Sequence, residues 1–198
     1  MGIKLGNKNK FLPKDVLKEK PNDARTLQVL LFSSEKNWAL ANETKFSQAR
    51  KHSQKSRARF VSVKKLKRAV EWAEKLSNMA KEHNDNITQL EAQAYQLYLE
   101  GSCDFERQQW AQAQSKLIAC REILGDVGKV SDSMSERAVG EKVDQIEQTI
   151  KFCNFKMSKG KKALSVAEIV ELRKGADAGL SEIMEVRFCL VSNLPRRS

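Results

Sequence analysis

Residues 59–79 read RFVSVKKLKRAVEWAEKLSNM, and this stretch decides the fold. At about 100° per residue, its apolar side chains fall on two separate faces of a helix. One face carries Val63, Leu66, Val70, Ala73 and Ser77, the other carries Ala69, Trp72, Leu76 and Met79, and a third, basic face carries Lys64, Arg68 and Lys75. Two apolar faces predict packing neighbours on two sides. A helix of this kind belongs inside a stacked helical array, with one narrow stripe left for solvent or a ligand.

The rest of the chain also favours helices. Its prolines, Pro13, Pro21 and Pro195, lie near the ends, so residues 22–194 contain no obligate helix breaker. Ala, Leu, Glu, Lys and Gln are abundant and β-branched runs are few, which favours helix over strand. We predict an all-α protein, an irregular tetratricopeptide-like array of antiparallel helices. Its expected parts are a basic lead-in of loop and a short turn of helix over 1–22, one helical domain over 23–190 and a basic tail over 191–198.

Amphipathic patterns and capping signals divide the helical domain. They predict helices over about 23–50, 59–83, 88–107 and 109–127, then helices from Ser133 and Ser165 and a weaker seventh segment after Gly179. Thr88 with Glu91, and Ser165 with Glu168, have the spacing of a capping box. Residues 52–59 are either a connector or a frayed continuation of helix, and residues 125–131 are expected to form a loop.

Positive charge is concentrated in and before the quoted helix. From Thr44 to Val70 the chain has ten basic residues and no acidic one. Residues 1–70 contain 18 Lys and Arg against 5 Asp and Glu, whereas residues 71–198 contain 18 against 20. A one-signed field at this density costs self-repulsion unless a polyanion neutralises it. We therefore expect a nucleic-acid partner first, and an anionic membrane surface or an acidic protein second.

Other classes of site find little support in the sequence. Cys103, Cys120, Cys153 and Cys189 are far apart and there are two histidines, which makes a zinc site improbable. Three of the cysteines lie among apolar residues, which predicts reduced core thiols in a cytosolic protein. No segment approaches the ~20 apolar residues of a membrane span, and no catalytic motif or glycine-rich phosphate loop occurs. We expect no enzyme activity, no cofactor, no metal and no small-molecule substrate.

A repeat signature is present in the centre of the chain. The core spacing of a tetratricopeptide unit is reproduced by Gly101, Trp110, Ala113, Leu117 and Cys120. Its second half recurs 44 residues earlier at Leu66, Ala69, Ala73 and Leu76, whereas a regular repeat has a period of about 34. The usual aromatic residue three positions after the glycine is Asp104. The array is therefore expected to be irregular.

Several stretches resemble a known family. They are residues 66–76 (LKRAVEWAEKL), residues 90–101 (LEAQAYQLYLEG) with Phe105, Glu106, Gln109 and Trp110, residues 6–11 (GNKNKF) and residues 35–39 (EKNWA). In wording and order they resemble the sixty-eight-kilodalton protein subunit of the eukaryotic signal recognition particle. The resemblance covers most of the chain and is clearest from Gly6 to Gln114.

The resemblance implies a function. In that family this region is the N-terminal RNA-binding domain, which docks on the particle's RNA near a helical junction and bends it. It implies a scaffolding role in cotranslational targeting to the endoplasmic reticulum, in the cytoplasm, with nucleolar passage during particle assembly. Other particle proteins are expected partners, including the seventy-two-kilodalton subunit, which the family binds through a C-terminal region. That region and the family's arginine-rich segment upstream of residues 6–11 are absent, so we expect an excised domain.

Candidate RNA contacts follow from the basic run. The leading candidates are Lys64, Lys67 and Arg68 on the exposed stripe, with Arg57 and Arg59 before it. Further candidates are Lys51, Lys55 and Lys65, then Lys8, Lys10 and Lys14 as a mobile arm, and last Lys159, Lys161 and Lys162. Phe46 and Phe60 lie near the patch and could stack on a base, but their periodic placement predicts core positions.

A second class of function stays open at this point. A tetratricopeptide-like module also forms a groove that binds peptides, and the same lysines would attract an acidic one. The RNA hypothesis predicts that binding depends on RNA shape and falls steeply with salt. The peptide hypothesis predicts competition by acidic peptides.

Overall fold

The computed structural model describes residues 5–6, 10–11, 24–49, 55–82, 85–130, 133–158 and 165–174, together with Ile183, Glu185, Arg187, Leu190 and Val191. Its helices are α1 (Ala24–Ala49), α2 (Lys55–Ala80), α3 (Asn86–Glu106), α4 (Trp110–Val130), α5 (Ser133–Met157) and α6 (Val166–Lys174). Two short strands, β1 (Leu5–Gly6) and β2 (Lys10–Phe11), pair antiparallel. This ladder falls in the lead-in, where we expected loop and a turn of helix.

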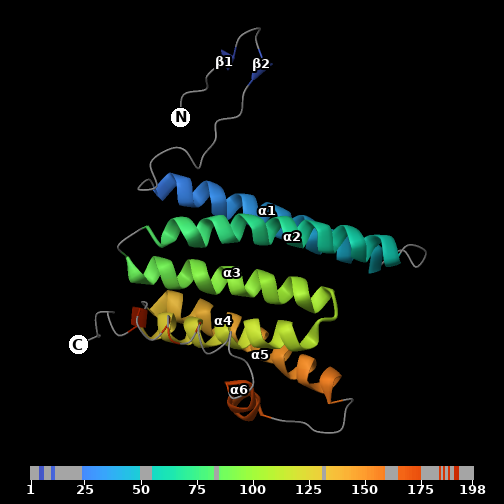
Figure 1. The fold of residues 1–198 in the computed structure, drawn as a ribbon, viewed down its shortest axis with the longest axis vertical. Helices are drawn as coiled ribbons and strands as arrows, with labels where there is room; N and C mark the ends of the chain where they lie inside the picture. Colours follow the sequence, from blue (N-terminus) through green and yellow to red (C-terminus); the bar gives the residue numbers. More distant parts are fainter. Residues whose placement is uncertain are drawn as a thin grey trace.

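The prediction of an all-α array of antiparallel helices is confirmed. Successive helices run in opposite directions and stack side by side (Figure 1). As a result, the C-terminal ends of α1, α3 and α5 lie at the same end of the molecule as the N-terminal ends of α2 and α4. The extensive contacts are between helices that are consecutive in sequence, from α1 with α2 to α4 with α5.

Some predicted boundaries differ from the observed ones. Helix α2 begins at Lys55, so the described part of the predicted connector, residues 55–59, belongs to the helix. The predicted loop over 125–131 is wrong through residue 130, because α4 continues to Val130. A helix tolerates an isolated glycine at a cost of about 1 kcal/mol, and Asp126 and Val127 are buried between Gly125 and Gly128. Packing therefore holds the helix together where propensity suggested a break.

Capping was predicted correctly at one helix and incorrectly at another. Ser165 and Glu168 form a reciprocal capping box at α6: the Ser165 backbone N–H donates to the Glu168 carboxylate at 2.8 Å, and the Glu168 N–H donates to Ser165 Oγ at 3.3 Å. At α3 the cap is Asp85, whose carboxylate accepts from the backbone N–H groups of Ile87 and Thr88. Thr88 lies inside the first turn and donates its own hydroxyl to the Asp85 carboxylate, so Asp85 takes the capping position predicted for Thr88.

Small side chains bring α1 and α2 together. Ser34, Ala41, Ser62 and Ala69 are each at most 1 % exposed. Ser34 Oγ donates to the Ala69 carbonyl at 2.8 Å, and Ser62 Oγ donates to the Ala41 carbonyl at 3.2 Å. These two bonds cross the helix pair at separate levels. They fix the register of α1 against α2 and therefore the positions of the basic residues near the start of α2.

The predicted repeat unit forms the hairpin of α3 and α4. A Cβ atom on Gly101 would lie 2.9 Å from Leu117 Cγ, so the glycine permits the close approach of the two helices. The hairpin turn places Gln108 at a φ of 64°, in the left-handed region. Trp110 begins α4 and packs edge-on against Phe105, with ring centroids 5.3 Å apart. The hairpin thus has the packing that its sequence spacing predicted.

The largest core cluster lies among α3, α4, α5 and α6. Its fully buried members include Ile118, Ile123, Ile146 and Ile150. Partly buried Ile183, Leu190 and Val191 also pack against it, so the seventh segment contributes apolar side chains as predicted. Three of the four cysteines, Cys103, Cys120 and Cys153, are buried free thiols, in agreement with the prediction of core positions.

Candidate nucleic-acid interface

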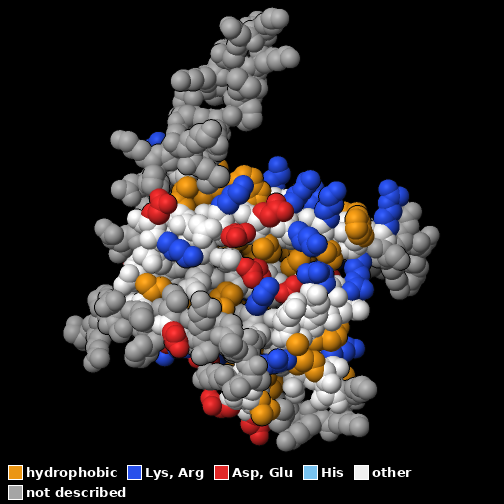
Figure 2. Space-filling model, viewed as in Figure 1, with side chains coloured by type: hydrophobic (Ala, Val, Ile, Leu, Met, Phe, Trp, Pro, Cys, Tyr) orange, Lys and Arg blue, Asp and Glu red, His pale blue; other side chains and the backbone are white. Residues whose placement is uncertain are grey.

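The exposed basic residues of the predicted run lie on the hairpin of α1 and α2. In Figure 2, Lys and Arg side chains gather over this hairpin, mostly toward the end at which α2 begins, and acidic side chains become frequent farther along it. On α2 the side chains of Arg57, Lys64, Lys67 and Arg68 are exposed, and that of Lys65 is half-buried. We call the four exposed residues the α2 basic face.

Helical geometry places the α2 basic face on one side of the molecule. Arg57 and Lys64 are seven residues apart, Lys64 and Lys67 three, and Lys64 and Arg68 four, so their side chains are neighbours on the helix surface. None of the four makes an ion pair with another described residue. Glu71 and Glu74 follow on the exposed side. The one-signed field therefore covers the first half of α2 and ends at Arg68.

Other sequence-predicted candidates are not placed by the structure. Lys51, Lys8, Lys14, Lys159, Lys161 and Lys162 lie outside the described residues. Lys55 is in α2 and Lys10 is in β2, but the structure describes their backbone alone. These residues stay predictions.

Two basic residues of the run have structural partners. Arg59, on the side of α2 that faces α3, donates from Nε and Nη2 to the backbone carbonyl of Glu106 at 2.9 and 2.7 Å. Lys45 of α1 forms an ion pair of 2.6 Å with the Glu106 carboxylate. A cation at a helix C-terminus is favourable because the last carbonyl groups lack partners. Arg59 and Lys45 thus join α1, α2 and the end of α3.

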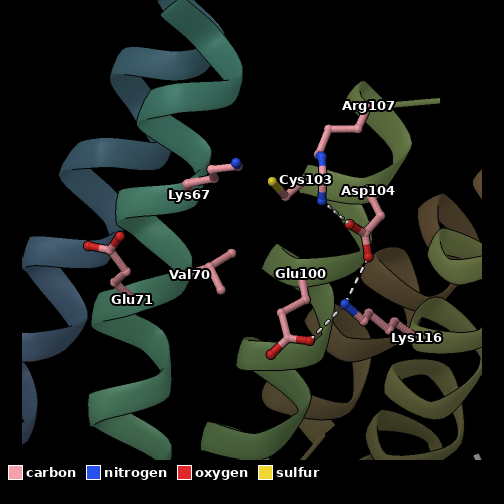
Figure 3. A pocket seen from close by; sticks show the side chains of 8 residues that line it. All are labelled: Lys67, Val70, Glu71, Glu100, Cys103, Asp104, Arg107 and Lys116. Carbon is pink, nitrogen blue, oxygen red and sulfur yellow. Dashed lines mark hydrogen bonds and ion pairs between the residues drawn. The ribbon is translucent and has the colours of Figure 1, made fainter. Parts of the chain in front are cut away.

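A groove between α2 and α3 lies beside the basic face (Figure 3). It encloses about 300 Å³ and is lined by Lys67, Val70 and Glu71 of α2, by Glu100, Cys103, Asp104 and Arg107 of α3, and by Lys116 of α4. In Figure 3 the Lys67 ammonium group points across the groove toward Cys103. Lys67 therefore serves both surfaces, the basic face of α2 and the wall of the groove.

Two of the groove carboxylates, Asp104 and Glu100, are already paired with cations. Lys116 Nζ lies 2.8 Å from Asp104 Oδ2 and 3.0 Å from Glu100 Oε2, and Arg107 Nη1 lies 3.4 Å from Asp104 Oδ1. Burial acts to lower the pKa of Lys116, but the hydrogen bonds to Asp104 and Glu100 raise it above its ordinary value. Asp104, which stands where a regular repeat has an aromatic residue, thus takes part in a part-buried ion-pair network. This network leaves Lys67 as the groove cation without a described carboxylate partner.

The two aromatic residues near the patch are not in the core. Phe46 is 75 % exposed and Phe60 is 70 % exposed, so the prediction for both was wrong. Phe46 follows the buried Ala41 by five residues, which turns it about 140° away from the buried side of α1. Phe60 follows Arg57 by three residues and precedes Lys64 by four, so it shares the α2 basic face. The spacing of Phe60 from these basic residues is the sequence signal that could have placed it outside the core.

Neither a metal centre nor a membrane-spanning helix is found in the part of the chain that the structure describes. It has no group of three or more His, Cys, Asp or Glu residues arranged to hold a metal ion. None of its helices combines the length and the apolar character that crossing a bilayer requires.

Comparisons with known proteins agree in pointing to one family. The sequence profile of the family described as RNA-binding signal recognition particle 68, SRP68, matches residues 1–187. Signal recognition particle subunit SRP68 of Drosophila melanogaster is 30 % identical over 173 residues, which are 85 % of this chain and 28 % of that protein. The Caenorhabditis elegans subunit is 25 % identical over 185 residues, which are 89 % of this chain and 30 % of that protein. The chain thus spans less than a third of the length of these relatives.

A solved structure supports the fold. The SRP68-RBD from Chaetomium thermophilum superposes with a TM-score of 0.65 at 22 % sequence identity. The similarity covers 87 % of this chain and 80 % of that chain.

Proposed function

Because this chain belongs to the SRP68 family of RNA-binding signal recognition particle proteins, we propose that it binds the RNA of that particle through the α2 basic face. The observation that carries the proposal is that Arg57, Lys64, Lys67 and Arg68 are exposed together on one rigid helix and make no ion pair with another described residue. Cations in such an arrangement release condensed counterions when they contact phosphates, which provides most of the affinity for nucleic acid.

The shape of the surface supports a structured RNA as the ligand. A-form RNA has a deep, narrow major groove that side chains cannot read, so a helical module recognises backbone, shape and unpaired nucleotides. The α2 basic face lies on a helix held on two sides, by Ser62 against α1 and by Arg59 against α3. A rigid row of cations can match a fixed phosphate path at a helical junction with little loss of conformational entropy.

The wider role belongs to the same proposal. By this proposal the chain scaffolds the particle for cotranslational targeting to the endoplasmic reticulum, in the cytoplasm, with nucleolar passage during assembly. Its partners are the particle RNA and other particle proteins, including the seventy-two-kilodalton subunit. RNA binding in this role requires no catalytic step.

A charge-matched pair of variants tests the proposal. The first variant changes Lys64, Lys67 and Arg68 to Gln, and the control changes the exposed Lys36, Lys81 and Arg137 to Gln. Both lose three positive charges, but only the first alters the α2 basic face. Affinity for junction RNA is measured over a series of salt concentrations. Each lost phosphate contact lowers the slope of log K against log salt by about 0.7 to 0.9, so the first variant should lose about 2 to 3 from that slope and the control much less.

Equal losses in the two variants would mean that net charge, not the α2 basic face, determines binding. Competition by heparin, plain duplex RNA and an acidic peptide separates the remaining alternatives. Junction RNA should compete best. If the acidic peptide competes equally well, the peptide-binding function explains the surface better.

A further inference from the structure

The inference concerns Phe60, an aromatic side chain exposed within the α2 basic face. Phe60 is 70 % exposed, whereas the nearby apolar residues Ala58, Leu66 and Ala69 of the same helix are at most 6 % exposed. Arg57 and Lys64 adjoin it on the helix surface, three residues before and four residues after. An isolated exposed apolar residue is ordinary, but this one lies where phosphates of a bound RNA would be attracted from both sides.

The ring of Phe60 has open faces. The cation–π pairs among the described residues are Lys75 with Trp72, Lys142 with Tyr98 and Lys156 with Phe152, and the aromatic contacts involve Phe105, Trp110 and Phe152. Phe60 takes part in none of them. Neither a described cation nor a described ring therefore occupies the surface on which a planar ligand would stack.

The helical turn that carries Phe60 is held in place. The preceding residue, Arg59, donates two hydrogen bonds to the Glu106 carbonyl, and Ser62, two residues after Phe60, donates one to the Ala41 carbonyl. The backbone on which the ring is mounted is thus fixed to both α1 and α3. A Phe side chain has only two rotatable angles, so stacking a base on it costs little conformational entropy.

We propose that Phe60 stacks on an unpaired base of the bound RNA while Arg57 and Lys64 contact the flanking phosphates. This inference rests on the proposed RNA-binding function and adds a nucleotide subsite to it. Every base has a π face and a negatively charged phosphate on each side, which matches one aromatic ring between two cations. A fully paired duplex keeps its bases stacked inside, so the subsite would act on loop, bulge or junction nucleotides.

The test compares three substitutions of Phe60 with a matched control. Phe60→Ala removes the ring, Phe60→Leu keeps an apolar side chain without a π face, and Phe60→Trp enlarges the ring. The control is Phe32→Ala, because Phe32 is 67 % exposed on α1 and its helix-surface neighbours Gln28 and Lys36 do not form a one-signed patch. Thermal unfolding of each variant checks that the fold is unchanged.

Two RNAs of equal length are used, a junction RNA with unpaired nucleotides and a fully paired duplex. Phe60→Ala should weaken junction binding about 5- to 150-fold, the range for losing one base–aromatic stack, with an unchanged salt slope. Phe60→Leu should lose nearly as much, Phe60→Trp should keep wild-type affinity, and Phe32→Ala should bind as wild type does. All variants should bind the duplex equally. A 2-aminopurine at the stacked position should be quenched by wild-type protein and not by Phe60→Ala.

The outcomes separate this inference from the function on which it rests. If wild-type protein binds junction RNA no better than the Lys64, Lys67 and Arg68 triple variant does, the RNA-binding function itself fails. If that difference is present but Phe60→Ala binds junction RNA as tightly as wild type, only the stacking subsite is refuted. Full affinity of Phe60→Leu, or an equal loss on the duplex, would also refute stacking, because either would show a contact that needs no exposed base.

Discussion

Arg59 donates two hydrogen bonds to the backbone carbonyl oxygen of Glu106, at 2.9 and 2.7 Å, and so closes the C-terminal end of α3 from the neighbouring helix. Lys45 approaches the same residue from α1 and lies 2.6 Å from its carboxylate. One acidic residue is thus held by cations from two other helices. The basic run of the sequence therefore contains two groups, residues that brace the fold and residues that face outward.

The two groups should respond differently to mutation. Arg59→Ala should lower the free energy of unfolding by about 1 kcal/mol, because the end carbonyl of α3 loses a charged donor. The outward-facing Arg57, two residues away, provides the control: Arg57→Ala should change stability by less than about 0.5 kcal/mol. Denaturant unfolding of the two variants measures the difference. Equal destabilisation would contradict the assignment of Arg59 as the bracing residue.

Gly101→Ala should destabilise the protein although alanine favours helices. A Cβ atom there would lie 2.9 Å from Leu117 Cγ and 3.0 Å from Leu117 Cδ2, and Leu117 is 2 % exposed in the core. Overpacking a close helix contact typically costs about 1 to 3 kcal/mol, which outweighs the gain of up to about 1 kcal/mol in helix propensity. Urea unfolding would show a lower midpoint with an unchanged slope.

Gly125→Ala and Gly140→Ala should have the opposite effect and stabilise the protein. Both glycines lie inside helices, and a Cβ atom at either would meet no atom within 4 Å. Because no clash opposes it, the higher helix propensity of alanine should add about 0.5 to 1 kcal/mol to the free energy of unfolding at each position. A loss of stability at Gly125 would indicate that α4 needs its glycine for a conformation other than the helix described above.

Asp126 should make stability depend on pH in the acid range. Burial acts to raise the pKa of its carboxyl group, but hydrogen bonds and charge from Arg187 and Lys129 lower the pKa below its ordinary value. A lowered folded-state pKa contributes stability above the unfolded-state pKa of about 3.9, and this contribution is lost as pH falls through the folded-state pKa. Asp126→Asn should therefore be less stable than wild type at pH 7, and the difference should shrink toward pH 3.

The exposed Asp144 serves as the control for this experiment, because Asp144→Asn changes the same functional group without breaking a described ion pair. Chemical unfolding at a series of pH values gives the two curves. A constant gap between wild type and Asp126→Asn from pH 7 to pH 3 would exclude the proposed linkage.

Buried thiols should react slowly in the folded protein. Burial raises the pKa of the Cys120 thiol to about 12 and that of Cys153 to about 11, and it also raises the pKa of Cys103. Alkylation requires the thiolate, so at pH 8 these three cysteines should be modified only when the protein opens. In a Cys189→Ser background, the labelling rate should rise with denaturant in parallel with unfolding. Fast labelling without denaturant would contradict the described burial.

Much of the fold could be predicted from the sequence, because the helices are long and strongly periodic. The two apolar faces of α2 correctly indicated neighbours on two sides, and the spacing of Gly101 and Leu117 indicated the close hairpin. The ends of the helices were harder to predict where helix propensity and tertiary packing disagree. The glycines at 125 and 128 suggested a loop where α4 continues. The residues before Arg59 are polar, so the first turn of α2 could not be recognised by an apolar pattern.

The candidate site was predicted in part. The basic run located the exposed residues Arg57, Lys64, Lys67 and Arg68, since charge of one sign excludes a core position. It could not show that Arg59 caps α3, because that contact joins residues 47 positions apart. Phe60 was wrongly assigned to the core because an apolar residue near a periodic pattern ordinarily packs inward. Its spacing of three residues from Arg57 and four from Lys64 was the sequence signal for the basic face.

The stacking of each helix mainly against its neighbours in sequence has a consequence for cooperativity. In such a chain the stability is close to a sum of unit energies and nearest-neighbour interface energies. Opening should therefore spread from the ends, where a unit has one interface, and α6, with few contacts to α5, should exchange its amide hydrogens fastest. The centre, α3 and α4, should exchange slowest. A ligand on α2 would then protect amides most strongly in α1 to α3 and progressively less toward α6.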